Sequence, residues 1–119
     1  MKKVLIADDD VDLLDMVKML LSRAGFAIST IASGKSFYER VSIIKPDIIL
    51  LDVFLGDSDG RTLCQLVKTD PEYQDIPVIL YSAGYISTSS IFQSKANAFF
   101  SKPFDIKDLV EKIKALVKK

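Results

Sequence analysis

The sequence predicts an α/β domain in which five parallel strands form one sheet that is covered by helices on both faces. Short apolar runs of β type alternate with segments of helical periodicity along the whole 119-residue chain. Strands and helices that alternate in this way build parallel sheets. The run Ile48–Leu51 is continuously apolar, as expected of a strand that is buried on both faces.

The five predicted strands share β-branched or aromatic residues and polar flanks. They are Val4–Ala7, Ala27–Ile31, Asp47–Leu51, Val78–Tyr81 and Ala98–Phe100. Because crossovers between parallel strands are right-handed, few topologies remain, and we expect the strand order 2-1-3-4-5. In such a sheet ligands bind beyond the carboxyl ends of the strands, between strands one and three.

Local signals place the first three helices. The first helix is expected to begin after an N-cap at Asp10 and to end before Gly25, because these residue types favour those ends. The second is predicted over residues 35–45 and is stopped by Pro46. The third is predicted over residues 59–68, with Asp59 as its cap.

The last two helices differ in their patterns. The segment Ile86–Ala96 contains four consecutive Ser or Thr residues, which are poor helix formers, so we expect this helix to be short, frayed or mobile. The final helix opens at Asp105, carries Asp108 in its first turn and ends in lysines that suit a helix C-terminus.

Composition excludes several function classes. Lys and Arg together number 16, as do Asp and Glu, so the formal net charge of zero argues against nucleic-acid binding and a polybasic membrane anchor. The chain contains no histidine, which excludes the Ser-His, Cys-His and His-metal arrangements of many hydrolases. Cys64 is the only cysteine and is interpreted as a core residue. We therefore expect a single cytoplasmic domain over residues 1–119, without a membrane span.

Polar residues follow four of the predicted strands. Asp8 and Asp9 end the first strand, Asp52 follows the third, Ser82 follows the fourth, and the fifth runs into Lys102. If the topology is correct, all five side chains meet at one edge of the sheet.

These residues predict a metal-assisted phosphoryl acceptor. Three clustered carboxylates repel one another, so at least one pKa should rise, and a hard cation relieves the repulsion. The predicted Mg²⁺ ligands are Asp9, Asp52 and the backbone carbonyl of Phe54, with Asp8 acting through a water; Mn²⁺ can replace Mg²⁺. Ionised Asp52 can attack phosphorus directly, while Lys102 and Ser82 hold phosphoryl oxygens.

At these positions the chain resembles response-regulator receiver domains of the CheY-like family, over essentially its whole length. The matching segments are Leu5–Asp10, Asp47–Leu55 with Asp59–Gly60, Tyr81–Ala83 and Phe99–Phe104. The resemblance implies a flavodoxin-like three-layer sandwich. It also implies that Phe99 is the switch aromatic, which turns inward when Ser82 engages the phosphoryl group. It leaves open whether the Lys102–Pro103 peptide bond is cis or trans.

The resemblance further implies a two-component phosphorelay protein rather than a conventional enzyme. Its partners would be a sensor histidine kinase or phosphotransfer protein, and a downstream target or output domain. The output surface would be the face made by the fourth helix, fifth strand and fifth helix. The only reaction that it would catalyse is the hydrolysis of its own phosphoryl group. Phe54 and Gly84 stand at positions that modulate the rate of this self-dephosphorylation in the family.

The sequence departs from the common family pattern in three places. Gly56 stands where proline is frequent, and Lys95–Ala96 replaces a frequent glycine–alanine pair. The segment from Ser82 to Lys102 also looks about two residues short. The last two departures affect the fourth helix and leave the acceptor residues intact.

Two other functions are alternatives to this one. A receiver-like interaction module that is never phosphorylated would not need intact Asp9, Asp52, Ser82 and Lys102. A Mg²⁺-dependent phosphatase would need a general acid two residues after its nucleophile, where this chain has Phe54. The sequence leaves open whether the chain acts alone or belongs to a longer regulator, although the Met1 start favours an N-terminal position.

Overall fold

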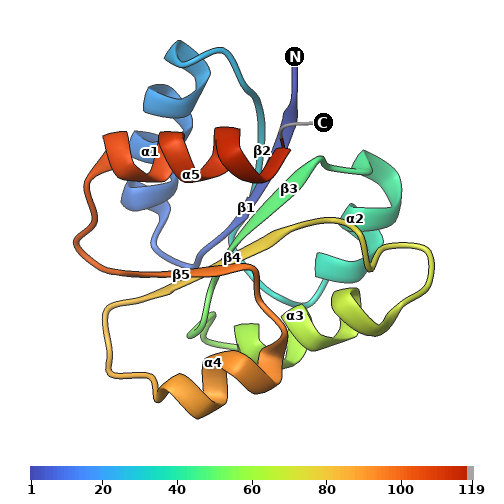
Figure 1. The fold of residues 1–119 in the computed structure, drawn as a ribbon. Helices are drawn as coiled ribbons and strands as arrows, with labels where there is room; N and C mark the ends of the chain where they lie inside the picture. The colour runs from blue at the N-terminus through green and yellow to red at the C-terminus, as the bar shows by residue number, and fades with distance from the viewer. Residues whose placement is uncertain (118–119) are drawn as a thin grey trace.

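The computed structural model describes residues 1–117, and in that part five parallel strands form one sheet in the order β2-β1-β3-β4-β5. The predicted α/β class and strand order are thereby confirmed. The strands are β1 (Lys3–Ala7), β2 (Ala27–Ile31), β3 (Ile48–Asp52), β4 (Val78–Ser82) and β5 (Ala98–Ser101). Figure 1 shows the sheet between two layers of helices.

Five helices connect the strands. They are α1 (Val11–Arg23), α2 (Phe37–Ile44), α3 (Gly60–Thr69), α4 (Thr88–Ser94) and α5 (Ile106–Val117). Helices α1 and α5 cover one face, and α2, α3 and α4 cover the other (Figure 1). None of the helices within the described residues is both long and apolar enough to cross a membrane.

The two faces bury separate apolar clusters. On the α1–α5 side, buried Leu14, Leu21 and Ile113 pack against residues of β1, β3 and β4. On the other side, Phe37 and Val67 pack on the same central strands. Because β1, β3 and β4 have cover on both faces, their side chains are apolar along nearly their full length. This pattern is what made the central strands visible in the sequence.

Helix ends follow local side-chain chemistry. The Asp10 carboxylate accepts a hydrogen bond from the Leu13 amide at 3.1 Å, and Asp59 accepts one from the Arg61 amide at 2.9 Å. Both residues are thus N-caps, as predicted. Gly25 follows α1 with φ of +100°, a conformation that glycine adopts without a Cβ clash.

The fourth helix is short, as predicted, but its ends differ from the expected residues 86–96. It spans seven residues, and Ser87 is its N-cap because the Ser87 hydroxyl accepts a hydrogen bond from the Ser90 amide at 3.1 Å. The serine-rich segment therefore contains the start signal of the helix as well as its weak interior. The lysines predicted to end the last helix, Lys118 and Lys119, lie outside the described residues.

Candidate phosphoryl-acceptor site

The acidic residues after β1 and β3 form one cluster at the carboxyl edge of the sheet. Oxygen atoms of Asp8, Asp9 and Asp52 lie within 4.8 Å of one another. Asp8 is fully buried and Asp52 is 4% exposed, whereas Asp9 is exposed to solvent. One carboxylate of the three therefore faces water directly, and two are held in the protein.

The third strand places Asp52 next to the end of β4. Asp52 pairs with Tyr81 across the β3–β4 ladder, and its Oδ1 accepts a hydrogen bond from the Phe54 amide at 3.2 Å. Burial and, second to it, the negative charge of Asp8 raise the pKa of Asp52 to about 6, although the Phe54 amide and the Lys102 charge act in the opposite direction. The prediction that at least one carboxyl pKa in the cluster is raised is confirmed.

Lys102 joins the two buried carboxylates. Its Nζ lies 3.1 Å from Asp8 Oδ2 and 3.3 Å from Asp52 Oδ2. Burial alone would lower the pKa of Lys102, but the hydrogen bond and charge of Asp8, together with Asp52, outweigh that effect and raise it. The ammonium group is therefore held in its charged form beside the Asp52 carboxylate.

Ser82 lies at the same edge of the sheet. Its side chain is fully buried, and its Oγ accepts a hydrogen bond from the Gly84 amide at 3.1 Å. The Lys102 amide donates to the Ser82 carbonyl at 2.9 Å, so the backbone of β4 and the residue after β5 are linked. All five residues predicted from the strand ends therefore gather at one edge of the sheet.

Phe54 and Phe99, the other two predicted residues, lie near the site in different settings. The Phe54 side chain is 51% exposed, and a Cβ on Gly84 would stand 3.4 Å from its ring. Phe99 is half-buried on β5 and lines a hollow of about 550 Å³ beside α4. The peptide bond before Pro103 is cis.

The residues present fit a divalent cation. Three carboxylates converge, and the negative charge of Asp8 adds to burial in raising the pKa of Asp52. The loop after β3 approaches them closely: Gly56 has φ of +82°, and a Cβ there would lie 3.0 Å from Asp9 Oδ2. Oxygen donors of this kind are the ligands that Mg²⁺ prefers.

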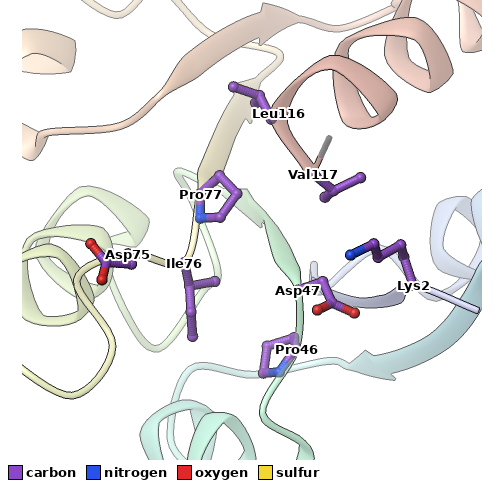
Figure 2. Close-up of a pocket in the computed structure, with 8 residues that line it drawn as sticks. All are labelled: Lys2, Pro46, Asp47, Asp75, Ile76, Pro77, Leu116 and Val117. Atoms are coloured by element: carbon purple, nitrogen blue, oxygen red, sulfur yellow. The ribbon is translucent and has the colours of Figure 1, made fainter. Parts of the chain in front are cut away.

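A separate hollow lies at the opposite end of the sheet. It has a volume of about 240 Å³, and its lining includes Lys2, Asp47 and Pro77, each next to the amino end of a strand (Figure 2). None of the predicted site residues lines it. It is therefore unrelated to the acidic cluster.

Sequence reasoning missed the role of Tyr81. Its hydroxyl donates a hydrogen bond to Asp8 Oδ2 at 2.9 Å, and Lys102 Nζ lies 5.0 Å from its ring centroid. The available signal was a phenol at the end of an otherwise apolar strand, because a buried hydroxyl needs a partner. Cys64 is buried, as predicted, and burial raises its thiol pKa to about 11.

Comparison with known proteins identifies the class. A model of the response regulator receiver domain matches residues 4–114. The chain is 33% identical to the DNA-binding dual master transcriptional regulator RpaA of Synechocystis sp., and 35% identical to the heme response regulator HssR of Staphylococcus haemolyticus. Both alignments cover all of this chain but only 50% and 53% of those proteins, so the chain spans about half the length of these relatives.

Solved structures agree with this assignment. A receiver domain of a DNA-binding response regulator from Colwellia psychrerythraea superposes with a TM-score of 0.92 at 26% identity, and the match covers 100% of both chains. A response regulator from Chloroflexus aurantiacus gives a TM-score of 0.91 at 29% identity, covering 99% of this chain and 98% of that one. The chain belongs to the response-regulator receiver domain family, whose general property is phosphorylation on an aspartate.

Proposed function

We propose that Asp52 is the phosphoryl acceptor of this receiver domain. The observation that carries the proposal is the placement of its carboxylate: it is almost fully buried at the end of β3, next to Asp8 and 3.3 Å from the Lys102 ammonium. A carboxylate in this setting is a nucleophile that needs no proton removed.

The residues that would hold Mg²⁺ are Asp9, Asp52 and the Phe54 carbonyl, with Asp8 reached through a water. When bound, the cation would neutralise the carboxylates and draw charge from phosphoryl oxygens. Two observations support this assignment: carboxylate oxygens of Asp8, Asp9 and Asp52 lie within 4.8 Å of one another, and Gly56 approaches Asp9 closely. The same residues fit Mn²⁺, which also prefers oxygen ligands.

The chain's own residues would transfer the phosphoryl group by positioning and charge. An Asp52 oxygen forms the new bond to phosphorus, and the bond from phosphorus to the donor atom breaks, with its electron pair leaving on the donor. Lys102 would move from its contact with Asp52 to a phosphoryl oxygen, and the Ser82 hydroxyl would donate to another. Water attack on the acyl phosphate would later restore Asp52, so the domain would turn over only itself.

The donor and the target follow from the class. The donor would be the phosphohistidine of a sensor kinase or phosphotransfer protein, which is the usual phosphoryl donor of receiver domains. On engagement of the phosphoryl group by Ser82, Phe99 would turn inward and alter the surface formed by α4, β5 and α5. Phe99 lines the hollow beside α4, so a movement of its ring would change the shape of this surface. The target would be a protein or an output domain that binds this surface.

Intact mass spectrometry tests the acceptor. The wild-type chain is incubated with acetyl phosphate and Mg²⁺, alongside Asp52→Asn and the control Asp75→Asn. Asp75 is one of the residues around the hollow at the far end of the sheet. The wild type and Asp75→Asn should each gain one phosphoryl adduct, and Asp52→Asn none. An adduct of equal yield on Asp52→Asn would overturn the proposal.

A further inference from the structure

Tyr81 has a buried hydroxyl that the proposed reaction does not use. The residue is 4% exposed and lies on β4 immediately before Ser82. Its ring packs edge-on against Phe104, with ring centroids 5.7 Å apart. A phenylalanine would fill this place equally well, because the surrounding cluster is apolar. The hydroxyl therefore needs an explanation of its own, since burying a hydroxyl without a partner is costly.

The nearer of the two acceptors of that hydroxyl is Asp8, whose carboxylate is fully buried, whereas the Ala7 carbonyl lies at 3.5 Å. Asp8 Oδ1 accepts a hydrogen bond from the Asp10 amide at 2.9 Å. Asp8 Oδ2 accepts two hydrogen bonds, from the Tyr81 hydroxyl at 2.9 Å and from Lys102 Nζ at 3.1 Å. The two oxygens are thus held by three donors: one from the loop after β1, one from β4 and one from the loop after β5.

The two donors to Asp8 Oδ2 differ in their freedom. Lys102 also contacts Asp52 Oδ2 at 3.3 Å, and a long flexible stem carries its ammonium group. Tyr81 is anchored by its ring in the apolar layer, so its hydroxyl has a fixed direction. If Lys102 shifts toward a phosphoryl group on Asp52, Tyr81 remains to satisfy the buried oxygen of Asp8.

We infer that Tyr81 is a positioning residue of the acceptor site, and that its hydroxyl fixes the Asp8 carboxylate for Mg²⁺ binding while Lys102 is free to engage the phosphoryl group. The inference rests on the proposed function, because it assigns Asp8 to the cation site. Donors that orient a ligand carboxylate in this way commonly set metal affinity by about 10- to 100-fold. Asp8 acts through a water, so the lower end of this range applies.

The test compares Mg²⁺ binding of the full chain and its Tyr81→Phe variant by titration calorimetry. Tyr81→Phe keeps the ring and its contact with Phe104 and removes only the hydroxyl. We expect Mg²⁺ affinity to fall by about tenfold. The matched control is Tyr73→Phe, which removes the hydroxyl of another buried tyrosine, on the other side of the sheet, and should leave the affinity within about twofold.

Two further readouts separate positioning from general packing. In an Asp8→Asn background, Tyr81→Phe should weaken Mg²⁺ binding no further, because residues that act through one contact are not additive. Mg²⁺ should also change the ultraviolet absorption of a tyrosine in the wild type and in Tyr73→Phe, and this change should be lost in Tyr81→Phe. The spectral readout on the wild type does not depend on the stability of any variant.

The outcomes are distinct. Wild-type affinity in Tyr81→Phe, or an equal further loss in the Asp8→Asn background, would overturn the role of Tyr81 and leave the proposed function standing. A wild-type chain that binds no Mg²⁺ and gains no phosphoryl adduct would overturn both.

Discussion

Helices α4 and α5 cover opposite faces of β5, and different interactions hold them there. Helix α5 has 12 residues and buries Leu109 and Ile113 completely or nearly so in the apolar layer that it shares with α1. Helix α4 has seven residues; of its two large apolar side chains, Ile91 is only half-buried and Phe92 is exposed. The comparison separates an element fixed by apolar burial from one that is fixed mainly by polar contacts.

Helix α3 supplies the polar contacts of α4. Arg61 Nη1 donates to Ser90 Oγ at 2.9 Å, while the rest of the guanidinium group is paired with Asp59. One turn later, Gln65 donates to the Gln93 carbonyl at 3.4 Å. Polar bonds that are exposed or only partly buried contribute little net free energy, because water replaces them when they break. A helix held in this way can shift at low cost, which suits the element proposed to respond to phosphorylation.

The largest expected effect comes from truncating the apolar anchors. Ile113→Ala should lower the free energy of unfolding by about 3 kcal/mol, because it removes a fully buried side chain and leaves a cavity. Ile91→Ala in α4 should cost only about 1 kcal/mol, because the side chain is half-buried. Urea unfolding of both variants measures the difference, and equal losses would remove the distinction between the two helices.

A second effect concerns the acidic cluster at the carboxyl ends of β1 and β3. Asp52 is protonated more readily in the folded chain than in the unfolded chain, where its pKa is near 3.8, because folding raises it to about 6. The ionised carboxylate therefore lowers stability, and this penalty grows as pH rises from about 4 through 6. Without Mg²⁺, Asp52→Asn should be more stable than wild type by about 1–2 kcal/mol at pH 7.

Unfolding experiments in a metal chelator check this prediction at two pH values. The advantage of Asp52→Asn should shrink at pH 4, where wild-type Asp52 is largely protonated in the folded chain. An advantage that is the same at pH 4 and pH 7 would contradict the account of the acidic cluster.

A smaller effect is expected from Arg61→Ala. The change removes the link from α3 to Ser90 and leaves the cap at Asp59, whose bond to the Arg61 amide comes from the backbone. Global stability should fall by about 1 kcal/mol or less, while amide hydrogen exchange in residues 91–94 should accelerate several-fold. Arg40→Ala on α2 is the control. If amide exchange in α4 is unchanged in Arg61→Ala, the polar bonds from α3 do not hold α4 in place.

The comparison also explains what the sequence could predict. Short apolar runs alternating with helical segments identified all five strands to within one residue at each end. The central strands were the clearest, because burial on both faces of the sheet leaves continuous apolar runs such as 48–51. The bounds of α4 were less accurate, since its ends depend on local polar geometry. Ser87 caps the helix, and Lys95 ends it with φ of 67°, in a left-handed conformation that non-glycine residues seldom adopt.

The candidate site shows the same contrast between features set by topology, which were predictable, and features set by local side-chain geometry, which were not. Asp8, Asp9, Asp52, Ser82 and Lys102 could be placed together because topology alone brings strand ends to one edge. The Tyr81–Asp8 bond could not, because it depends on which face of β4 the side chain takes and how far its ring reaches. Arg61 was missed for a similar reason: its partner Ser90 is 29 residues away, on another helix.

The central claim is that a phosphoryl group on Asp52 acts on α4 and leaves the apolar α1–α5 layer in place. The most direct measurement is amide hydrogen exchange with and without beryllofluoride and Mg²⁺, in wild type and Asp52→Asn. Changes in exchange should concentrate in residues 83–101 of the wild type, with α1 and the buried turns of α5 unaffected and Asp52→Asn unresponsive. Exchange that changes equally throughout the wild type, or that changes in Asp52→Asn as well, would contradict the claim.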